Sequence, residues 1–594
     1  MRTAQPRQRG WRHNPDRDNR QRRPLPSQED PAIIPDSKVG QYRALLRQAG
    51  ILDEITTLLA GRPGPAGFPI EALFVGFMLA CTYRRGSTNL DDVSEVLATQ
   101  LTPHARELLG IPEHCYRIDD ALASHAAYAR VQRAFNAVTT VLDPHRHNRR
   151  SRVPGAAAIV IRGTWTTNRP AADRITRLAN GFVHASIEKA VSVGALRKWN
   201  GDIGIDGTPA PTWGRQRRET GDVLDPHADW YAKGGSSDLI WADGLTLAFS
   251  GHADPAASGK YPRLALGMEL HTPNIDDDRA VTNILSLIDA RFRFRRGIIA
   301  LDRGYGDRKP TFYHAIRATD RDLVFDYKST SIGKQKSTPA KAAWFGGVPI
   351  CPHTPAHLLE GAALLAKKTS RTDKRRGREL MDQVVPFQFQ TKEHPKEPGG
   401  SYRIQCPAAG PSPTVTCPWA EERENRGRPD RKPMPAVTIE LTDPRNLRTT
   451  PLTMPRVQPP EKPFDDRPIC CKRATSTVPS DSNPKYRQTY LHGSTAWHRR
   501  YSVVRALNEG GNGSVKSIDL DVADAKVRLP RGRVAQTLLL GIQLMMANLR
   551  QIRVWGWGDG DKSEERSMAT ANEGTDSTPV SAGAAPEPIE RPPR

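Results

Sequence analysis

The sequence predicts an α/β protein whose central strands carry carboxylates to one edge of a sheet. Residues 298–301 form an unbroken apolar run, typical of a strand buried on both faces, and Asp302 and glycines follow at once. A second strand-like run, residues 201–205, leads into Asp206 and another glycine. Open α/β sheets bind ligands outside the carboxyl ends of their strands, so we expect both side chains at a site. The alternative for Asp302 is a carboxylate that only caps the turn or the next helix.

The first part of the chain is expected to be a basic arm followed by a helical domain. Residues 1–35 are rich in Arg, Gln and Pro and cannot bury a core. We expect a disordered tail there, with a loose phosphate-binding arm as the alternative, and a second disordered tail over residues 558–594. Residues 36–143 carry apolar residues at helical spacing. Gly50 ends the first of these helices, and Thr102 before a proline begins a later, short one.

Residues 144–197 are predicted to form a basic, loosely structured link and then a helix. In residues 198–329 the periodicity predicts three strands, a helix, a strand, a helix and a strand. This order matches a ribonuclease H-like fold with a mixed sheet, and it places Asp206 and Asp302 on neighbouring central strands. Three consecutive acids, 276–278, precede the first of these helices. We interpret them as favourable charge at its N-terminus rather than as metal ligands.

Residues 330–494 are predicted to be an insertion domain, because they are Pro-rich and charged. Their weak periodicity predicts a helix near 358–367 and strands near 386–390, 402–405 and 436–441. Five of the seven cysteines lie here, but not as the Cys-x2-4-Cys pairs that zinc sites usually use. We therefore expect buried structural thiols rather than a zinc site. The five are Cys351, Cys406, Cys417, Cys470 and Cys471.

The final core segment, residues 495–557, contains a third carboxylate between two cations. Arg505 and Glu509 are four residues apart, and Lys516 lies seven further on. One helix would therefore place all three on one face. Such a face suits a group that binds a metal ion beside phosphates. A strongly apolar helix over residues 534–549 is expected to pack on the sheet.

At these motifs the chain resembles the DDE transposases of bacterial insertion sequences, over residues 36–556. The first Asp stands in a strand ending Asp-Gly-Thr and the second in an Asp-x-Gly-Tyr turn. The Glu stands in a pattern similar to Tyr-x2-Arg-x3-Glu-x6-Lys, although Tyr501 is one residue further from the Arg and residues 510–513 add a glycine-rich stretch. The residues that match are Asp206, Asp302, Arg505, Glu509 and Lys516.

The resemblance implies a ribonuclease H-like catalytic core that cleaves DNA at transposon ends and joins it to a target. Two metal ions, Mg²⁺ or Mn²⁺, would serve both steps. The helical domain would bind the terminal repeats of double-stranded DNA, and a homodimer is expected on DNA because two ends must be cut together. The implied catalytic residues and metal ligands are Asp206, Asp302 and Glu509. The implied DNA contacts are Arg505, Lys516, Tyr501 and Arg303, with a simple surface arginine as the alternative for Arg303.

The composition agrees with a nucleic-acid partner. Lys and Arg number 87 against 65 Asp and Glu, a net charge of +22. No apolar signal segment opens the chain and no apolar run reaches about 18 residues, so we expect a cytoplasmic, nucleoid-associated bacterial protein without a membrane span. Two alternatives remain open. One is a decayed or domesticated transposase that only binds DNA, and the other is a metal-dependent nuclease of the same fold that cleaves without joining.

Overall fold

The computed structural model describes most of the chain between residues 33 and 556. Within this span, residues Ile34–Trp555 form one compact unit. Most of the predicted basic arm, the predicted tail and the strand expected near 436–441 lie outside the described residues. The described ranges are 33–60, 68–112, 121–145, 151–214, 216–217, 220–232, 239–252, 260–366, 370–426, 454–515 and 522–556.

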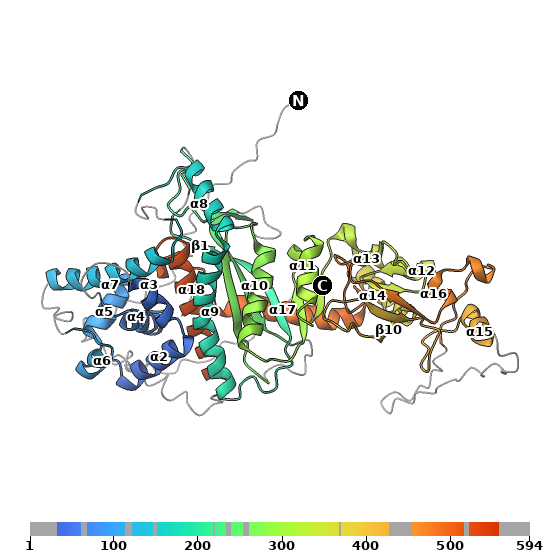
Figure 1. Ribbon diagram of the computed structural model, residues 1–594, viewed down its shortest axis with the longest axis horizontal. Helices are drawn as coiled ribbons and strands as arrows, with labels where there is room; N and C mark the ends of the chain where they lie inside the picture. The colour runs from blue at the N-terminus through green and yellow to red at the C-terminus, as the bar shows by residue number, and fades with distance from the viewer. Residues whose placement is uncertain are drawn as a thin grey trace, which may run out of the picture. The chain divides into compact units, whose positions relative to one another are not determined.

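The first part of the described chain is helical, as predicted, and Figure 1 draws its helices in blue. The helix α4 forms the centre of its packing, because every residue from Ala72 to Cys81 is buried. Gly50 ends α2 with a φ of 70°, a left-handed conformation that glycine adopts without a steric penalty. Thr102 caps α6, since its hydroxyl accepts a hydrogen bond from the Ala105 N–H at 2.9 Å. The helices are α2 (Asp36–Ala49), α3 (Leu52–Leu59), α4 (Ile70–Tyr83), α5 (Leu90–Thr99), α6 (Pro103–Leu108) and α7 (Ala121–Leu142).

The prediction of a basic link before the core is wrong for its second half, where the chain forms α8 (Gly155–Thr167). The buried side chains of this helix, Ala158, Ile161 and Trp165, recur three and four residues apart. That apolar stripe is narrow, and the arginines just before it favoured the prediction of a loosely structured basic link. The helix predicted to follow is present as α9 (Arg169–Ser192).

A six-stranded mixed sheet lies at the centre of the α/β region. Its order is β2-β3-β1-β5-β6, and β4 also pairs with β3. The strands β1, β3 and β4 are antiparallel to their neighbours in this group, whereas β1, β5 and β6 run parallel. Two helices, α10 (Asp277–Arg291) and α11 (Pro310–Arg317), connect β4 to β5 and β5 to β6. The strands are β1 (Ile203–Pro211), β2 (Asp229–Ala232), β3 (Leu239–Ser250), β4 (Ala265–His271), β5 (Ile298–Leu301) and β6 (Asp322–Phe325).

Two features of this sheet were not predicted. The strand β1 does not end at Asp206 but continues to Pro211, because it pairs with β3 along its whole length. The second half of β1 is rich in Gly and Pro, which are depleted in strands, so its pattern gave no signal. The second feature is the short strand β2 itself, which was not predicted and which pairs with only the first four residues of β3.

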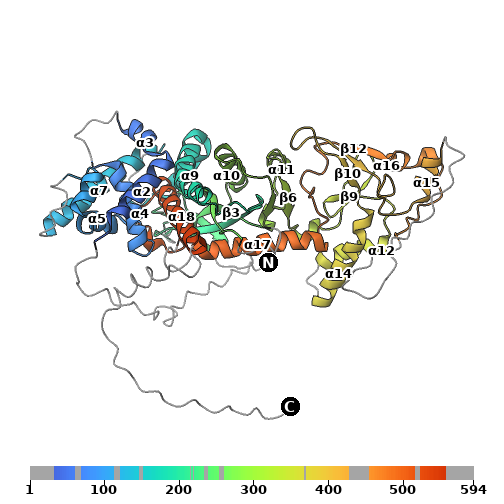
Figure 2. The same ribbon diagram turned by 90° about the horizontal axis from the view of Figure 1, so that it is seen from below.

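Two C-terminal helices, α17 (Thr495–Val515) and α18 (Arg533–Gly556), pack with the sheet (Figure 2). Side chains of α17 form a cluster with one face of β5 and β6, namely Trp497, Tyr501 and Val504 with Ile298, Ala300 and Val324. Ile299 and Leu301, which alternate with these strand residues, pack in a different cluster with residues of α10. The helix α18 is buried from Arg533 to Asn548. In the part of the chain that the structure describes, neither α18 nor any other helix is long and apolar enough to cross a membrane.

The predicted insertion folds around two small antiparallel sheets and its own hydrophobic cluster. The strand predicted near 402–405 is present as β11, and the helix predicted near 358–367 is split in two at Glu360. The helix α14 was missed, because only Gly377, Met381 and Val384 are buried in an otherwise charged sequence. The elements are β7 (Lys334–Gln335), β8 (Ala343–Phe345), β9 (Val348–Ile350), α12 (Ala356–Leu359), α13 (Gly361–Ala366), α14 (Arg371–Val384), β10 (Gln390–Glu393), β11 (Tyr402–Gln405), α15 (Pro418–Asn425), α16 (Ile469–Lys472) and β12 (Thr475–Val478).

Candidate active site

Asp206 and Asp302 lie side by side on adjacent parallel strands. Ile205 of β1 is in register with Leu301 of β5, and each carboxylate is the next residue along. Neighbouring strands are about 5 Å apart, so the two side chains leave the sheet close together. By the alternation of side chains, both lie on the face against which α17 packs. The structure therefore brings together two residues that are 96 positions apart in the sequence.

Asp302 does not serve as a helix cap. It precedes a short 3-10 helix, Arg303–Tyr305, but its side chain makes no capping hydrogen bond. Its Oδ1 atom is buried and accepts no hydrogen bond from the described residues, and Nη1 of Arg505 lies 3.5 Å from that oxygen. Arg505 is thus the ion-pair contact of this oxygen, and 40% of the Asp302 side chain is exposed, so the carboxylate is open to a further cationic partner.

Asp206 is half-buried in the middle of β1, and its Oδ1 accepts a hydrogen bond from the Gly207 N–H at 2.8 Å. The same carboxylate acts on Tyr231 of β2. Burial, and then the negative charges of Asp206, Asp277 and Asp302, raise the pKa of Tyr231 to about 12. Three acids thus act electrostatically on one phenol, so negative charge gathers in this part of the sheet.

The helix α17 carries the predicted site residues Arg505 and Glu509. Arg505 reaches Asp302 and remains 44% exposed, so it faces both the carboxylate and solvent. Glu509 lies one turn further along the same face, about 6 Å from Arg505 along the helix axis. The position of its side chain is outside the description, and Lys516 follows the last described residue of the helix.

Tyr501, predicted to contact DNA, is 5% exposed and stacks on Trp497 with the ring centres 4.7 Å apart. Burial, together with the charges of Asp326 and Asp302, raises the pKa of Tyr501 above its usual range. Tyr501 therefore packs beneath the carboxylates, and its ring is closed to an external partner in this structure.

Arg303 is paired with a carboxylate that sequence reasoning missed. Its Nη2 lies 2.7 Å from Oδ2 of Asp326, while 59% of the Arg303 side chain is exposed. Asp326 follows β6 as Asp302 follows β5, and His492 bonds its other oxygen at 3.0 Å. Burial alone would raise the pKa of Asp326, but the hydrogen bonds from His492 and Arg303 lower it below its usual value. An acid directly after an apolar strand was the available signal, but no glycine followed it.

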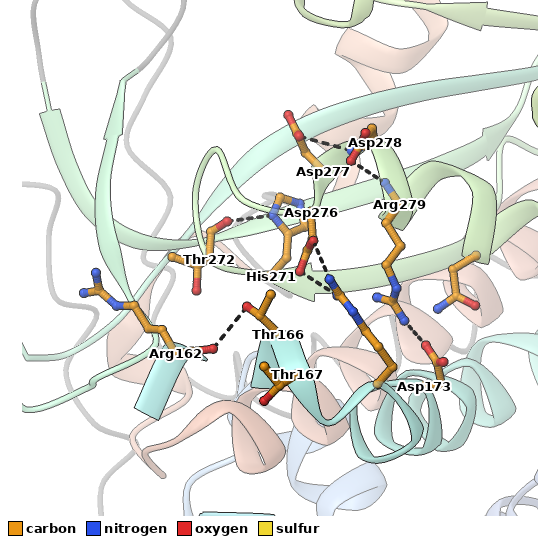
Figure 3. A network of polar contacts seen from close by, with 12 residues as sticks. Arg162, Thr166, Thr167, Asp173, His271, Thr272, Asp276, Asp277, Asp278 and Arg279 are labelled. Atoms are coloured by element: carbon orange, nitrogen blue, oxygen red, sulfur yellow. Dashed lines mark hydrogen bonds and ion pairs between the residues drawn. The ribbon is translucent and has the colours of Figure 1, made fainter. Parts of the chain in front are cut away.

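Two of the three acids at the start of α10, Asp276 and Asp277, pair with arginine side chains, and Figure 3 shows the contacts of Asp276. Both oxygens of Asp276 bond Arg169, at 2.7 and 3.0 Å, and Asp277 pairs with Arg308. The helix begins at Asp277, and Asp277 and Asp278 both lie in its first turn. This placement agrees with the predicted role as favourable charge at a helix N-terminus.

The donor set at Asp206 and Asp302 fits a hard divalent cation. Mg²⁺ prefers oxygen ligands, needs few from the protein and keeps several waters. The Oδ1 atom of Asp302 has no hydrogen-bond donor among the described residues and can accept such an ion. Within the same residues no three His, Cys, Asp or Glu side chains already form a metal site. The predicted third ligand, Glu509, has no described side chain.

Comparisons with known proteins gave no match: no family model fits the chain, and no curated protein or solved structure is significantly similar to it.

Proposed function

We propose that this protein is a DDE transposase that cleaves DNA at transposon ends and transfers the freed strand to a target. The observation that carries the proposal is the pair of carboxylates, Asp206 and Asp302, which directly follow the register pair Ile205–Leu301 of two adjacent parallel strands beneath α17. Arg505 lies on that helix at 3.5 Å from Asp302, and Glu509 follows one turn later.

The strand order supports a ribonuclease H-like core. In that fold, three antiparallel strands are followed by two parallel ones, and the first strand lies at the centre. Here β3 lies between β4 and β1 and is antiparallel to both, and β5 and β6 extend the sheet on the other side of β1, parallel to it. The helices α10 and α11 make the two crossovers that parallel pairing requires.

The chemistry assigned to the site is phosphoryl transfer. Asp206 and Asp302 would hold the metal ions, with Glu509 completing the set. When bound, two Mg²⁺ ions activate the attacking oxygen and stabilise the leaving one. Arg505 and Lys516 would hold the DNA phosphates on either side of Glu509, since guanidinium and ammonium groups bind phosphate oxygens. Water would be the nucleophile for cleavage and a freed 3′-hydroxyl for strand transfer.

A basic helix packs against the start of α17 and supports a DNA partner. Four cations of α14 are exposed, and Asp382 near its C-terminal end accepts a hydrogen bond from the Thr495 N–H at the start of α17, at 2.6 Å. The basic surface is therefore tied directly to the helix that carries Glu509. The four cations are Arg371, Lys374, Arg375 and Arg376.

The test is a cleavage assay on supercoiled DNA that carries the flanking terminal repeats, with Mg²⁺ or with EDTA. We expect nicking at the repeat ends in Mg²⁺, none in EDTA, and none with Asp302→Ala. Asp278→Ala is a matched control, because Asp278 is also acidic but lies in the first turn of α10. Specific binding to the ends without cleavage under any metal would favour the binding-only alternative, and intact cleavage by Asp302→Ala would overturn the proposed site.

A further inference from the structure

The five cysteines of the insertion, far apart in the sequence, converge on one cavity. Cys351 follows β9, Cys406 follows β11, Cys417 immediately precedes α15, and Cys470 and Cys471 lie in α16. All five line a single cavity together with His353. Its volume is about 10 Å³, the room of one water-sized particle, which is too small for an organic ligand. All five thiols are free of disulfide bonds.

Four of these cysteines interact electrostatically with one another. Every pair among Cys351, Cys406, Cys417 and Cys471 is near enough for an electrostatic interaction between the two side chains. Four sulfurs around an ion-sized space match the composition of structural zinc sites that are built from cysteines alone. The expectation of inert structural thiols depended on their spacing along the chain, and the structure replaces that spacing with proximity.

Three of the cysteines share a local structure that prepares sulfur as an acceptor. Cys351, Cys406 and Cys417 are each followed by proline, and the backbone N–H two residues after each cysteine bonds its sulfur. Hydrogen bonds to sulfur stabilise thiolates and orient them as ligands. Three separate chain segments thus place the same Cys-Pro turn around the same cavity.

A histidine and an arginine beside the cavity also suit bound thiolates. The side chain of His353 hydrogen-bonds Cys471, and its ring packs edge-on against Trp419 with the ring centres 4.9 Å apart. Arg423 also lines the cavity, and its Nη1 donates to the Cys471 carbonyl at 3.1 Å. Its Nη2 is buried without a hydrogen-bond partner among the described residues. A zinc ion with four thiolates carries net negative charge, which this guanidinium would offset.

We infer that the insertion binds one structural Zn²⁺ ion through Cys351, Cys406, Cys417 and Cys471. In the described residues the sulfurs are not yet arranged as a metal site, so binding requires rotation of the thiol side chains. The thiols lose their protons to solvent when the ion binds. The ion would tie together chain segments that span residues 351–471, in a region whose sheets have only three short strands each.

The full-length protein, purified without chelators in a reducing buffer, tests this inference by elemental analysis. We expect about one zinc per chain in the wild type and a loss of most of it in Cys406→Ser. Cys81→Ala is the control, because Cys81 is buried in α4 and lies outside the cavity. This variant should contain as much zinc as the wild type. Zinc content in the wild type no higher than in Cys406→Ser would overturn the inference.

A second measurement needs no variant. Replacement of zinc by Co²⁺ in the wild-type protein should give the near-ultraviolet absorption of thiolate-to-cobalt charge transfer, with an intensity that fits four thiolates. Absence of that band, or disulfides found among these cysteines by mass spectrometry of the freshly purified protein, would overturn the zinc assignment.

Discussion

At the scale of single residues, two carboxylates at the same edge of the sheet have opposite surroundings. Asp326 is bound on both oxygens, by Arg303 and by His492, whereas Oδ1 of Asp302 has no hydrogen bond from the described residues. Both follow parallel strands directly, so position alone does not separate them. The hydrogen bonds do: they tie Asp326 into the structure, and they leave Asp302 open to the metal-binding role that we propose for it.

This difference predicts unequal effects of substitution on the free energy of unfolding. Asp326→Asn should lower the free energy of unfolding by about 1–3 kcal/mol, because it weakens hydrogen bonds to charged donors. Asp302→Asn should change it by less than about 0.5 kcal/mol. Denaturant unfolding of the two variants and the wild type measures both values. A larger loss for Asp302→Asn would contradict the assignment.

A buried histidine predicts a pH dependence of stability. Burial, helped by Arg291, lowers the pKa of His184 to about 4, below its usual value of 6.5. Between these two pKa values the unfolded chain binds a proton at His184 that the folded chain does not. The free energy of unfolding should therefore be highest above about pH 6.5 and fall by up to about 3 kcal/mol as the pH drops to 4. His184→Gln should make unfolding free energies at pH 5 and pH 7 more nearly equal. An unchanged difference between the two pH values would show that His184 is not the titrating group.

At the scale of elements, the contact between α17 and β3 depends on a glycine. A Cβ atom on Gly511 would lie 3.0 Å from the Phe249 ring, whereas one on Gly513 would meet nothing within 4 Å. Of these two glycines, only Gly511 is needed for the close approach of α17 to β3. The glycines do not interrupt α17, which continues to Val515.

These two glycines form a matched pair for mutation. Gly511→Val should destabilise the protein by about 1–3 kcal/mol, because α17 must move away from Phe249. Gly513→Ala should be neutral or stabilise it by up to about 1 kcal/mol, since alanine favours a helix over glycine. Thermal unfolding measures both changes, and equal effects of the two substitutions would contradict the close contact.

The basic helix α14 makes a prediction about DNA binding. Simultaneous replacement of Arg371, Lys374 and Arg376 by Gln should weaken binding and reduce the salt dependence of log K by about 2–3, if each contacts one phosphate. The same change at Lys189 of α9 and at Arg197 and Lys198 in the turns after it, all exposed, is the control. Fluorescence anisotropy over a salt series measures the slopes. Equal slopes for the two triple variants would exclude α14 as the phosphate-binding surface.

Several elements were predictable because their pattern depends on burial alone. Residues 298–301, buried on both faces, and the apolar helix α18 are the clearest examples. The helices α8 and α14 were missed because each buries only three side chains among exposed or charged ones. The second half of β1 was missed because pairing with β3, rather than its own composition, makes it a strand.

At the scale of the whole molecule, the fold joins site residues that the sequence separates widely. Asp206, Asp302 and Glu509 could be selected from short motifs, but the long interval before Glu509 gave no information on how the chain returns to the sheet. The structure shows the return: Gln488 accepts hydrogen bonds from the Phe325 N–H at 3.1 Å and from the Trp497 indole at 3.0 Å. One side chain thus links β6 to α17 across the insertion. The grouping of the five cysteines is likewise a property of the fold that their spacing concealed.

The most direct test of the central claim asks whether residue 302 touches the metal ion. Asp302→Cys replaces a hard oxygen ligand with a softer sulfur, which accepts Mn²⁺ better than Mg²⁺. In the nicking assay we expect Asp302→Cys to be inactive in Mg²⁺ and to regain activity in Mn²⁺, while Asp302→Ala stays inactive in both. Wild-type nicking by Asp302→Ala in Mg²⁺, or restoration of Asp302→Ala and Asp302→Cys to the same extent by Mn²⁺, would contradict a metal ligand at this position.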